Sequence, residues 1–333
     1  MKRDIIVIGA SAGGVEALRQ FLPQLSPELP AALFITAHLP AHSPNLMPKI
    51  LQPLCRLPVL PAIDGAPVRQ GIVTVAVSDH HLMFNDSTVR LTRGPRENRA
   101  RPSVDVTFRS AALNFGPRCI GVVLSGMLDD GTAGLWAIAD QGGATIAQNP
   151  DDAEYPSMPR SAIANVPVQH TVPASELAAL LNRLTQEEVD RASSPLQSHL
   201  VKLEEQMAKG SGVPMSELAA VGVPSLNTCP HCNGVLLRVA GTAGPRFRCH
   251  TGHAFTPTSL LVDLDATIED KLWQILRSID ERIILLRQLR DLASNGSDES
   301  TAQEYARQIE DAMSRGQAFR QMLQQPAGFR AAP

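Results

Sequence analysis

The chain has 333 residues, of which 44% are hydrophobic and 19% are charged, and its formal net charge is -3. This length allows two domains with a sizeable core, and the balanced charge argues against a disordered acidic chain and a general nucleic-acid binder. The apolar run behind the basic start covers only residues 5–8. Such a run is too short for a signal peptide or a membrane span, so we expect a cytoplasmic protein.

From residue 5 to about residue 183, short apolar runs alternate with segments of helical periodicity. This alternation is typical of a parallel α/β sheet, and we predict a doubly wound, mostly parallel α/β domain. A β-hairpin, predicted from residues 82–84 and 89–92, interrupts the pattern. Strands are expected at residues 5–8, 32–37, 72–77, 119–124 and 144–147, and helices at residues 15–22, 46–51, 104–114, 134–141 and 175–184.

Three further regions follow this domain, which we bound at residues 1–184. Residues 185–228 are polar and lose their periodicity, which predicts a linker with one short helix. Residues 229–258 are rich in cysteine and predict a small zinc ribbon. Residues 259–333 predict an α-helical hairpin, broken near Asn295-Gly296-Ser297, whose apolar stripe packs within the chain or against a second copy to form a homo-oligomer.

Ser11 lies in the run Gly9-Ala10-Ser11-Ala12-Gly13-Gly14, between the first predicted strand and the first predicted helix. A tight turn at this point exposes a serine hydroxyl as a nucleophile elbow and directs N–H groups at the space in front of it. Similar turns bind phosphate in dinucleotide-binding folds, but here no acidic residue follows a second strand at the usual distance of about 20 residues. On this motif, a nucleophile and a phosphate-binding or structural turn remain alternatives.

Two more polar residues follow predicted strands. His38 comes directly after the second strand, and Asp130 comes after the fourth. Because functional residues collect beyond the carboxyl ends of parallel strands, Ser11, His38 and Asp130 are predicted to meet as the parts of a catalytic triad. Each has a structural alternative, a core histidine for His38 and a turn for Asp130. Residues 78–81 contain the same residue types, but consecutive side chains point in different directions and cannot align as a triad.

Several short segments spread over roughly residues 4–183 form a set: Gly9-Ala10-Ser11 through Gly14, His38-Leu39-Pro40, Arg101-Pro102-Ser103-Val104-Asp105-Val106, Gly126-Met127 through Asp130-Gly131, Ala147-Gln148-Asn149 and Met158-Pro159-Arg160. In order and spacing, the set resembles the catalytic domain of the chemotaxis protein-glutamate methylesterases. The resemblance implies a doubly wound α/β domain that hydrolyses glutamyl methyl esters on receptor helices. In that family, some members also deamidate glutamine.

Carried over by position, the resemblance implies roles for the three triad residues. Ser11 would be the nucleophile, His38 the general base and then the acid, and Asp130 the group that orients and stabilises the imidazolium. The substrate would be a methylated receptor-like protein, and catalysis would need no cofactor. Typical members begin with a phosphorylatable receiver domain, whereas this sequence begins at the first catalytic strand. We therefore expect constitutive activity, or control by the C-terminal region or by a regulatory partner protein.

The surroundings of the triad carry further predictions. In the family arrangement, Met127 lies near the oxyanion site. Ala12 stands where the family usually has threonine, whose hydroxyl could support the oxyanion or the base. We therefore expect weaker support of these groups rather than loss of activity. We place Arg101 with them as an oxyanion or substrate residue. Arg101 belongs to the arginine-rich loop of residues 93–101, which either faces an acidic protein substrate or is a solvated loop.

The cysteine-rich region predicts a structural zinc site. Cys229 and Cys232 form a CxxC turn, and Cys249 follows with His250 and His253 nearby. Two such turns joined by a hairpin supply four ligands to tetrahedral Zn²⁺. We choose His253 as the fourth ligand, because His250 is adjacent to Cys249 and would strain the turn. Four protein ligands leave no open position, so a chelator is expected to unfold this region without changing ester turnover.

The same region contains a small basic cluster, Arg238, Arg246 and Arg248, which by itself does not support nucleic-acid binding. The sequence therefore predicts a cytoplasmic methylesterase with a zinc ribbon. Two alternatives remain. One is a non-catalytic adaptor that uses the esterase domain and the ribbon as binding platforms, which the intact set of Ser11, His38 and Asp130 argues against. The other is a hydrolase of another ester.

Overall fold

A computed structural model describes residues 1–189, 199–239 and 244–324 of the chain, and residues 190–198, 240–243 and 325–333 lie outside the described part. The side chains of His199 and Met215 are also outside it. The chain divides into two compact units, Met1–Ser259 and Leu260–Pro333.

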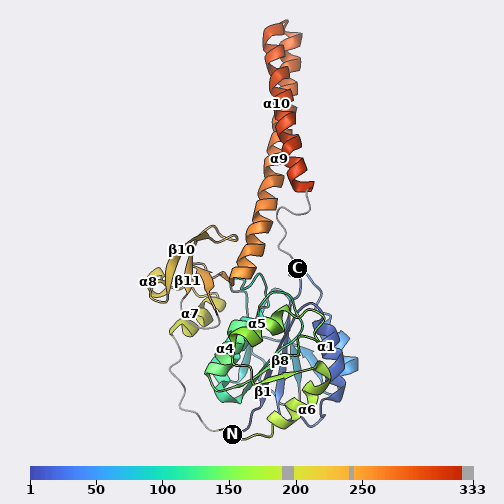
Figure 1. Cartoon of the computed structure of the whole chain (residues 1–333), viewed down its shortest axis with the longest axis vertical. Helices are drawn as coiled ribbons and strands as arrows, with labels where there is room; N and C mark the ends of the chain where they lie inside the picture. The colour runs from blue at the N-terminus through green and yellow to red at the C-terminus, as the bar shows by residue number, and fades with distance from the viewer. Residues whose placement is uncertain (190–198, 240–243, 325–333) are drawn as a thin grey trace. The chain divides into compact units, whose positions relative to one another are not determined.

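The first unit is built around a parallel sheet, of which β1 and β8 are labelled in Figure 1. Its seven strands in the described part of the chain follow the order β3-β4-β2-β1-β7-β8-β9. All five predicted strands occur in its interior. The two edge strands, β3 and β9, have three residues each and are too short to show a periodicity in the sequence. The strands are β1 (Ile5–Ala10), β2 (Ala32–Ala37), β3 (Val59–Pro61), β4 (Val73–Val75), β7 (Cys119–Val123), β8 (Ala144–Gln148) and β9 (His170–Val172).

Helices cover both faces of this sheet, so its central strands are mostly apolar. Ile6 and Ile8 of β1 face a core that α1, α2 and α6 complete, whereas Ile5 and Val7 face a second core built with α3, α4 and α5. Alternating residues of one strand thus enter two different cores. The predicted doubly wound α/β fold is confirmed. The helices are α1 (Gly14–Phe21), α2 (Met47–Leu51), α3 (Val104–Phe115), α4 (Thr132–Asp140), α5 (Ser157–Asn165) and α6 (Ala174–Leu184).

The predicted β-hairpin also occurs, as β5 (His81–Asn85) and β6 (Thr88–Thr92), and it forms a separate two-stranded sheet. It packs on α3, where the Phe84 N–H donates a hydrogen bond to Ser110 Oγ at 2.9 Å. Phe84 also makes edge-on ring contacts with Phe34 and Phe115. The hairpin therefore ties the loop that precedes α3 to the body of the domain.

Residues 185–228 differ from the predicted linker. They contain α7 (His199–Ala208), α8 (Met215–Ala219) and the start of a new sheet. Helix α7 packs against α3, where Glu205 accepts a hydrogen bond from Ser110 at 3.1 Å and Glu204 pairs with Arg109. Glu204 and Glu205 make the segment look polar in the sequence. They are buried nevertheless, because their charges are compensated inside the unit.

An antiparallel sheet follows α8, with four strands among the described residues: β10 (Gly222–Thr228), β11 (Val235–Val239), β12 (Arg246–Cys249) and β13 (Ala254–Phe255). We call residues 222–259 the cysteine module. Cys229 and Cys232 lie in the chain reversal between β10 and β11, and Cys249 ends β12 just before the reversal into β13. Leu237 of β11 packs with Leu203 and Met207 of α7, so the module is part of the first unit.

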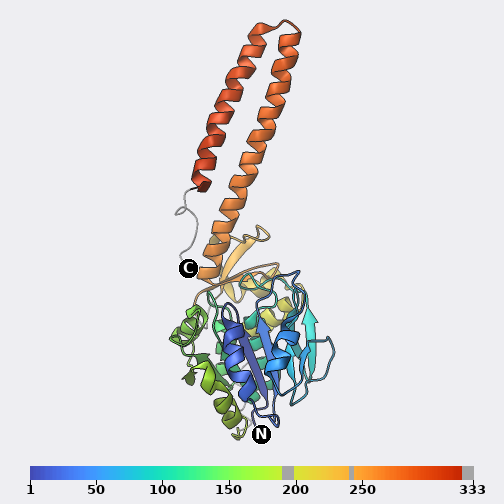
Figure 2. The same cartoon turned by 90° about the vertical axis from the view of Figure 1, so that its right-hand side faces the viewer.

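The second unit begins at Leu260 and is a hairpin of the rest of α9 (Pro257–Asn295) and of α10 (Glu299–Gln324), which Figure 2 shows side by side in orange and red. Ile283 and Leu286 of α9 pack against Ile309 and Ala312 of α10. The predicted helical hairpin is confirmed, and its apolar stripe packs within the chain; a homo-oligomer stays a prediction. Within the described residues, no helix is both long and apolar enough to span a membrane.

Candidate active site

The predicted triad lies at the carboxyl ends of three adjacent strands. Ser11 follows β1, His38 follows β2, and Asp130 lies in the loop between β7 and α4. Because β2 and β7 pair in parallel with opposite edges of β1, all three residues leave the sheet at the same end. This is the point where the strand order reverses, which is the usual place of a site in such sheets.

His38 connects the other two residues. Its Nδ1 lies 3.0 Å from Ser11 Oγ, and its Nε2 lies 2.7 Å from Asp130 Oδ2. With the ring proton on Nε2 donated to Asp130, Nδ1 can accept the Ser11 hydroxyl proton. The structure thus brings Ser11, His38 and Asp130 together in one hydrogen-bonded series, and their catalytic roles stay predictions.

Glycines allow the Ser11 turn to pack closely on the β7 loop. Gly13 has a left-handed φ of 71°, and a Cβ there would lie 2.5 Å from Ser125 Oγ. A Cβ on Gly126 would lie 2.9 Å from the Cβ of Ser11. The two segments are also joined by the Ser11 N–H, which donates to the Ser125 carbonyl at 2.9 Å. The glycines of the predicted motif therefore bring the nucleophile candidate and the Asp130 loop together.

Asp130 is 2% exposed and is surrounded by hydrogen-bond donors, several of them at the N-terminus of α3. Burial raises its pKa, but the hydrogen bond and charge of His38, together with donors such as the Val104 N–H and the Asn98 amide, outweigh burial and lower the pKa to about 2. The carboxylate stays ionised at neutral pH. Besides His38, the donors are Asn98 Nδ2 (3.1 Å), Ser103 Oγ (2.9 Å), Val104 N (2.7 Å), Asp105 N (3.1 Å) and Gly131 N (3.0 Å).

Two neighbouring carboxyl groups have raised pKa values. Burial, together with the Asp130 charge, raises the pKa of Asp105 to about 8. Burial also raises the pKa of Asp129 to about 6, and its Oδ1 accepts a hydrogen bond from Thr256 Oγ1 at 2.9 Å. Asp130 is therefore the best acceptor for the His38 proton among these three groups.

Two side chains that contact Asp130 were not predicted from the sequence. Ser103 immediately precedes the predicted helix at residues 104–114, and a serine at that position could have been found as a capping residue. Its hydroxyl instead donates to Asp130. Asn98 lies in a loop, without a periodicity or a motif that points to it.

Two of the predicted oxyanion residues present backbone N–H groups near Ser11. Within the described residues, no hydrogen-bond acceptor is found for the N–H of Ala12 or of Met127. The neighbouring N–H groups of Ser11 and Gly126 donate to the carbonyls of Ser125 and Tyr155. The Met127 side chain is 44% exposed, so its part of the loop is open to a substrate. These two N–H groups are therefore candidates for an oxyanion site, which stays a prediction.

Arg101 has partners away from the triad. It donates to Asp79 through Nε at 3.0 Å and to the Gly94 carbonyl through Nη1 at 2.7 Å. Arg93 forms an ion pair with the same Asp79. No contact joins Arg101 to Ser11 in the described structure, so an oxyanion or substrate role for Arg101 stays a prediction. These ion pairs brace the arginine-rich loop.

Residues 78–81 carry structural roles. His81 is fully buried and donates from Nε2 to the Pro95 carbonyl at 2.9 Å, and burial lowers its pKa to about 4. Ser78 donates to the Ser43 carbonyl at 2.9 Å. With Asp79 held by arginines, the four residues form no nucleophile–base pair.

The cysteine module brings a metal-ligating set together. The thiol and imidazole atoms of Cys229, Cys232, Cys249 and His253 all lie within 4.8 Å of one another. The Cys232 and Cys249 sulfurs are 3.6 Å apart, and His253 Nδ1 lies 3.7 Å from Cys229 Sγ and 3.5 Å from Cys249 Sγ. Tetrahedral zinc with its usual bond lengths requires about 3.8 Å between sulfurs and about 3.6 Å between sulfur and nitrogen. The donor set therefore fits Zn²⁺.

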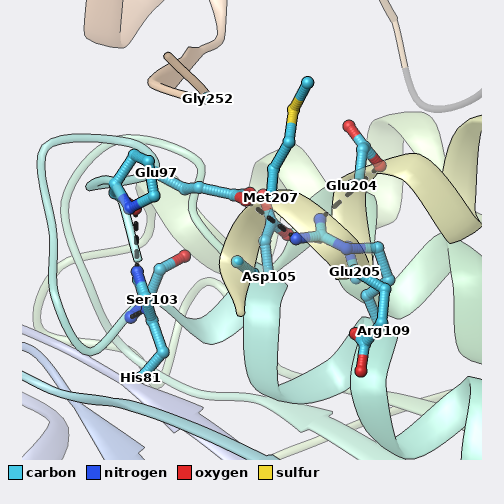
Figure 3. Close-up of polar contacts among 12 residues, drawn as sticks. His81, Glu97, Ser103, Asp105, Arg109, Glu204, Glu205, Met207 and Gly252 are labelled. Atoms are coloured by element: carbon cyan, nitrogen blue, oxygen red, sulfur yellow. Dashed lines mark hydrogen bonds and ion pairs between the residues drawn. The ribbon is translucent and has the colours of Figure 1, made fainter. Parts of the chain in front are cut away.

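The basic cluster of the module is mostly buried in ion pairs. Arg248 is 1% exposed and lies 3.1 Å from Glu204 and 3.0 Å from Glu97, and Arg246 lies 3.0 Å from Glu204. Figure 3 shows Glu97 and Glu204 converging from a loop and from α7 on Arg109 of α3. Two of the three predicted basic residues, Arg246 and Arg248, therefore form ion pairs with glutamates of the same unit.

Comparisons with known proteins identify the family of the N-terminal part of the chain. Residues 6–181 match the CheB methylesterase family. A Leptospira interrogans protein is 35% identical over 192 residues, which cover 57% of this chain and all of that protein. A protein of Chromohalobacter salexigens named protein-glutamate methylesterase/protein-glutamine glutaminase is 41% identical over 184 residues, which cover 54% of this chain and 52% of that protein.

A solved structure is also similar. The CheB methylesterase catalytic domain of Thermotoga maritima superimposes with a TM-score of 0.52 and 30% sequence identity, and the match covers 55% of this chain and all of that one. Matched relatives thus range from the isolated catalytic region to proteins about twice as long as the matched segment. The chain belongs to the CheB methylesterase family, a family of carboxylic ester hydrolases.

Proposed function

We propose that this protein removes methyl groups from glutamyl methyl esters on receptor-like proteins, with Ser11 as the nucleophile. The observation that carries the proposal is the hydrogen-bonded series from Ser11 through His38 to the buried Asp130. The relative from Chromohalobacter salexigens is named for this reaction, as a protein-glutamate methylesterase, and for a second one, as a protein-glutamine glutaminase. Family membership and site geometry therefore support one chemistry.

The reaction would proceed through an acyl-enzyme. His38 Nδ1 takes the proton of Ser11 as its oxygen attacks the ester carbonyl, and the ionised Asp130 stabilises the resulting imidazolium. His38 then gives that proton to the departing methanol. In the second half, His38 activates a water molecule that attacks the acyl-enzyme, which releases the glutamate side chain and restores Ser11. The same route on a glutamine amide would release ammonia.

The backbone N–H groups of Ala12 and Met127 would bind the oxyanion that forms in each half of the reaction. Donors already fixed in position stabilise such a charge without reorganisation, and removal of one such donor typically costs about 10²–10³ in kcat. Ala12 contributes its N–H whatever its side chain. Without the threonine hydroxyl, the oxyanion or the base would be supported less well, but the Ala12 N–H donor would remain in place.

The cysteine module would hold a structural Zn²⁺ through Cys229, Cys232, Cys249 and His253. The bound ion would crosslink the two chain reversals, and with four protein ligands it would take no part in ester chemistry. We further propose a cytoplasmic protein whose activity a partner protein or the C-terminal region controls. The absence of a membrane-spanning helix among the described residues is consistent with this location.

Methanol release from methylated receptor cytoplasmic fragments tests the proposal. Ser11→Ala is expected to lower kcat at least about 10³-fold, because the triad acts as a unit. Ser87→Ala, in the exposed hairpin turn, is the matched control and should retain the wild-type rate. Activity of Ser11→Ala within a few fold of wild type would contradict the assignment. No release by the wild type, despite labelling of Ser11 by a fluorophosphonate, would point to another ester.

A further inference from the structure

A tight turn lies between the triad and the cysteine module. Its four residues are Glu97-Asn98-Arg99-Ala100, closed by hydrogen bonds from Glu97 N to Ala100 O (3.3 Å) and from Ala100 N to Glu97 O (3.0 Å). Asn98 and Arg99 both have left-handed φ values, 49° and 69°. Two such residues define a type I′ turn, and asparagine is among the residues that tolerate this conformation best. The turn directs Asn98 into the protein, where it is 8% exposed.

The Asn98 amide bridges two buried carboxyl groups. Its Nδ2 donates to Asp130 Oδ1 at 3.1 Å and to Asp105 Oδ2 at 2.8 Å. A primary amide has two N–H groups, so it can satisfy both acceptors at once. His38 contacts the other oxygen of Asp130, Oδ2, at 2.7 Å. Asn98 is thus one of the donors that hold the carboxylate through the oxygen that His38 does not contact.

The cysteine module contacts this turn through its backbone and its charges. The Asn98 N–H donates to the Ala254 carbonyl of β13 at 2.9 Å. The neighbouring Glu97 carboxylate lies 3.0 Å from Arg248 of β12 and 2.9 Å from Arg109 of α3. Figure 3 shows the pair of Glu97 and Arg109. Thr256 of the module also binds Asp129, next to Asp130. The Asn98 turn and the loop that contains Asp129 and Asp130 are thus both attached to the module.

We propose that Asn98 is a positioning residue for Asp130 and that the cysteine module holds Asn98 in place. The inference rests on the proposed function of the triad. Asn98 touches neither substrate nor Ser11 in this scheme. It acts through Asp130, whose orientation sets the orientation of His38. An intact module would then be a requirement for full activity, although the module contributes no residue to the chemistry.

The variant that tests this is Asn98→Gly, because glycine accepts the left-handed φ and removes the amide without straining the turn. We expect kcat to fall about 10- to 100-fold with KM within about twofold, as for a residue that acts in the transition state only. The acid limb of the pH–rate profile should move to higher pH, since Asn98 is one of the donors that lower the Asp130 pKa.

Asn114→Ala is the matched control. The Asn114 amide donates to the carbonyls of Ser110 (2.8 Å) and Phe84 (3.3 Å) at the other end of α3. Its loss removes a comparable number of hydrogen bonds but should leave the acid limb unchanged. Asn98→Asp is the second variant, since it keeps the size and turn preference of asparagine but replaces the donor by an acceptor, and it should be at least as slow as Asn98→Gly.

The rate at which a fluorophosphonate labels Ser11 is measured beside methanol release, because it reports the alignment of Ser11 and His38 whatever the natural ester. Slower labelling by both Asn98 variants, with a thermal unfolding temperature no lower than that of Asn114→Ala, supports the inference. Labelling at the wild-type rate with an unchanged acid limb overturns it. Labelling of the wild type without methanol release would count against the proposed substrate and would leave the labelling comparison decisive for Asn98.

Discussion

The active-site edge of the sheet and the cysteine module each gather a few polar side chains, but they do so by different routes. The hydrogen-bonded pairs of the triad are 27 and 92 residues apart in the chain, and the parallel sheet brings them together. The sulfur and imidazole pairs of the module are 4 to 24 residues apart, and two short chain reversals bring them together. The first region depends on the whole domain, whereas the second depends on local spacing.

The two regions are nevertheless connected. The Glu97–Ala100 turn contacts Asp130 on one side and β13 on the other. The buried charges of Glu97, Arg109, Glu204 and Arg248 link α3, α7 and β12 behind that turn. A module that looks separable in the sequence is therefore built into the support of the active site.

The largest expected effect on kcat comes from a substitution at the active-site edge of the sheet. Asp130→Asn keeps the side-chain shape but loses the charge that stabilises the His38 imidazolium, and kcat should fall about 10³- to 10⁴-fold, as in other Ser-His-Asp enzymes. Asp129→Asn is the matched control and should cost less than about tenfold. Methanol release measures both. Similar losses for the two variants would show that the loop as a whole, and not the carboxylate bonded to His38, carries the effect.

The junction between the regions is tested by Glu204→Gln. Removal of one partner from a buried ion pair typically costs about 3–5 kcal/mol, because the remaining charges are left uncompensated. Three arginines, Arg109, Arg246 and Arg248, depend on Glu204. Urea denaturation of Glu204→Gln measures the cost, and Glu281→Gln, which breaks an exposed pair with Arg277, should change stability by less than about 0.5 kcal/mol.

The effect of Glu204→Gln should depend on pH. Burial raises the Glu204 pKa, but the charges of Arg246, Arg248 and Arg109 outweigh burial and lower it to about 2. Since the folded-state pKa lies below the unfolded value, Glu204 stabilises the protein above about pH 4.5 and loses this contribution as the pH falls toward 2. The stability difference between the two proteins should therefore shrink below pH 4.5. A difference that is equal at pH 7 and pH 3 would contradict an ionic contribution.

The smallest effect tests whether the module can be separated from the site. Cys232→Ser should abolish stoichiometric zinc binding and slow fluorophosphonate labelling of Ser11 about tenfold, a loss similar to that of Asn98→Gly. The sequence predicted no effect of metal loss on turnover, because it contained no sign of the turn between the regions. If loss of zinc acts through Asn98, the double variant Cys232→Ser/Asn98→Gly should label Ser11 little more slowly than either single variant. Full labelling after zinc loss would restore the view of an independent module.

Much of the fold could be predicted because apolar periodicity reports burial directly. The interior strands are buried on both faces and appear as continuous apolar runs, so their positions were expected within a residue or two. Edge strands β3 and β9, at three residues each, provide too short a pattern. Helix α7 was interpreted as part of a linker because buried Glu204 and Glu205 look like solvent-facing residues until their arginine partners are known.

By itself, the sequence determined the parallel α/β domain, the candidates Ser11, His38 and Asp130, the candidate metal ligands and the helical hairpin. Each of these follows from local information, such as a run, a turn or a spacing. Tertiary structure decided which ring nitrogen of His38 faces Ser11, which donors surround Asp130, and that Asn98 reaches Asp130 while Ala254 holds the turn. Those contacts join residues distant in the chain through hydrogen bonds without a periodic signature, so they exist only once the layers have packed.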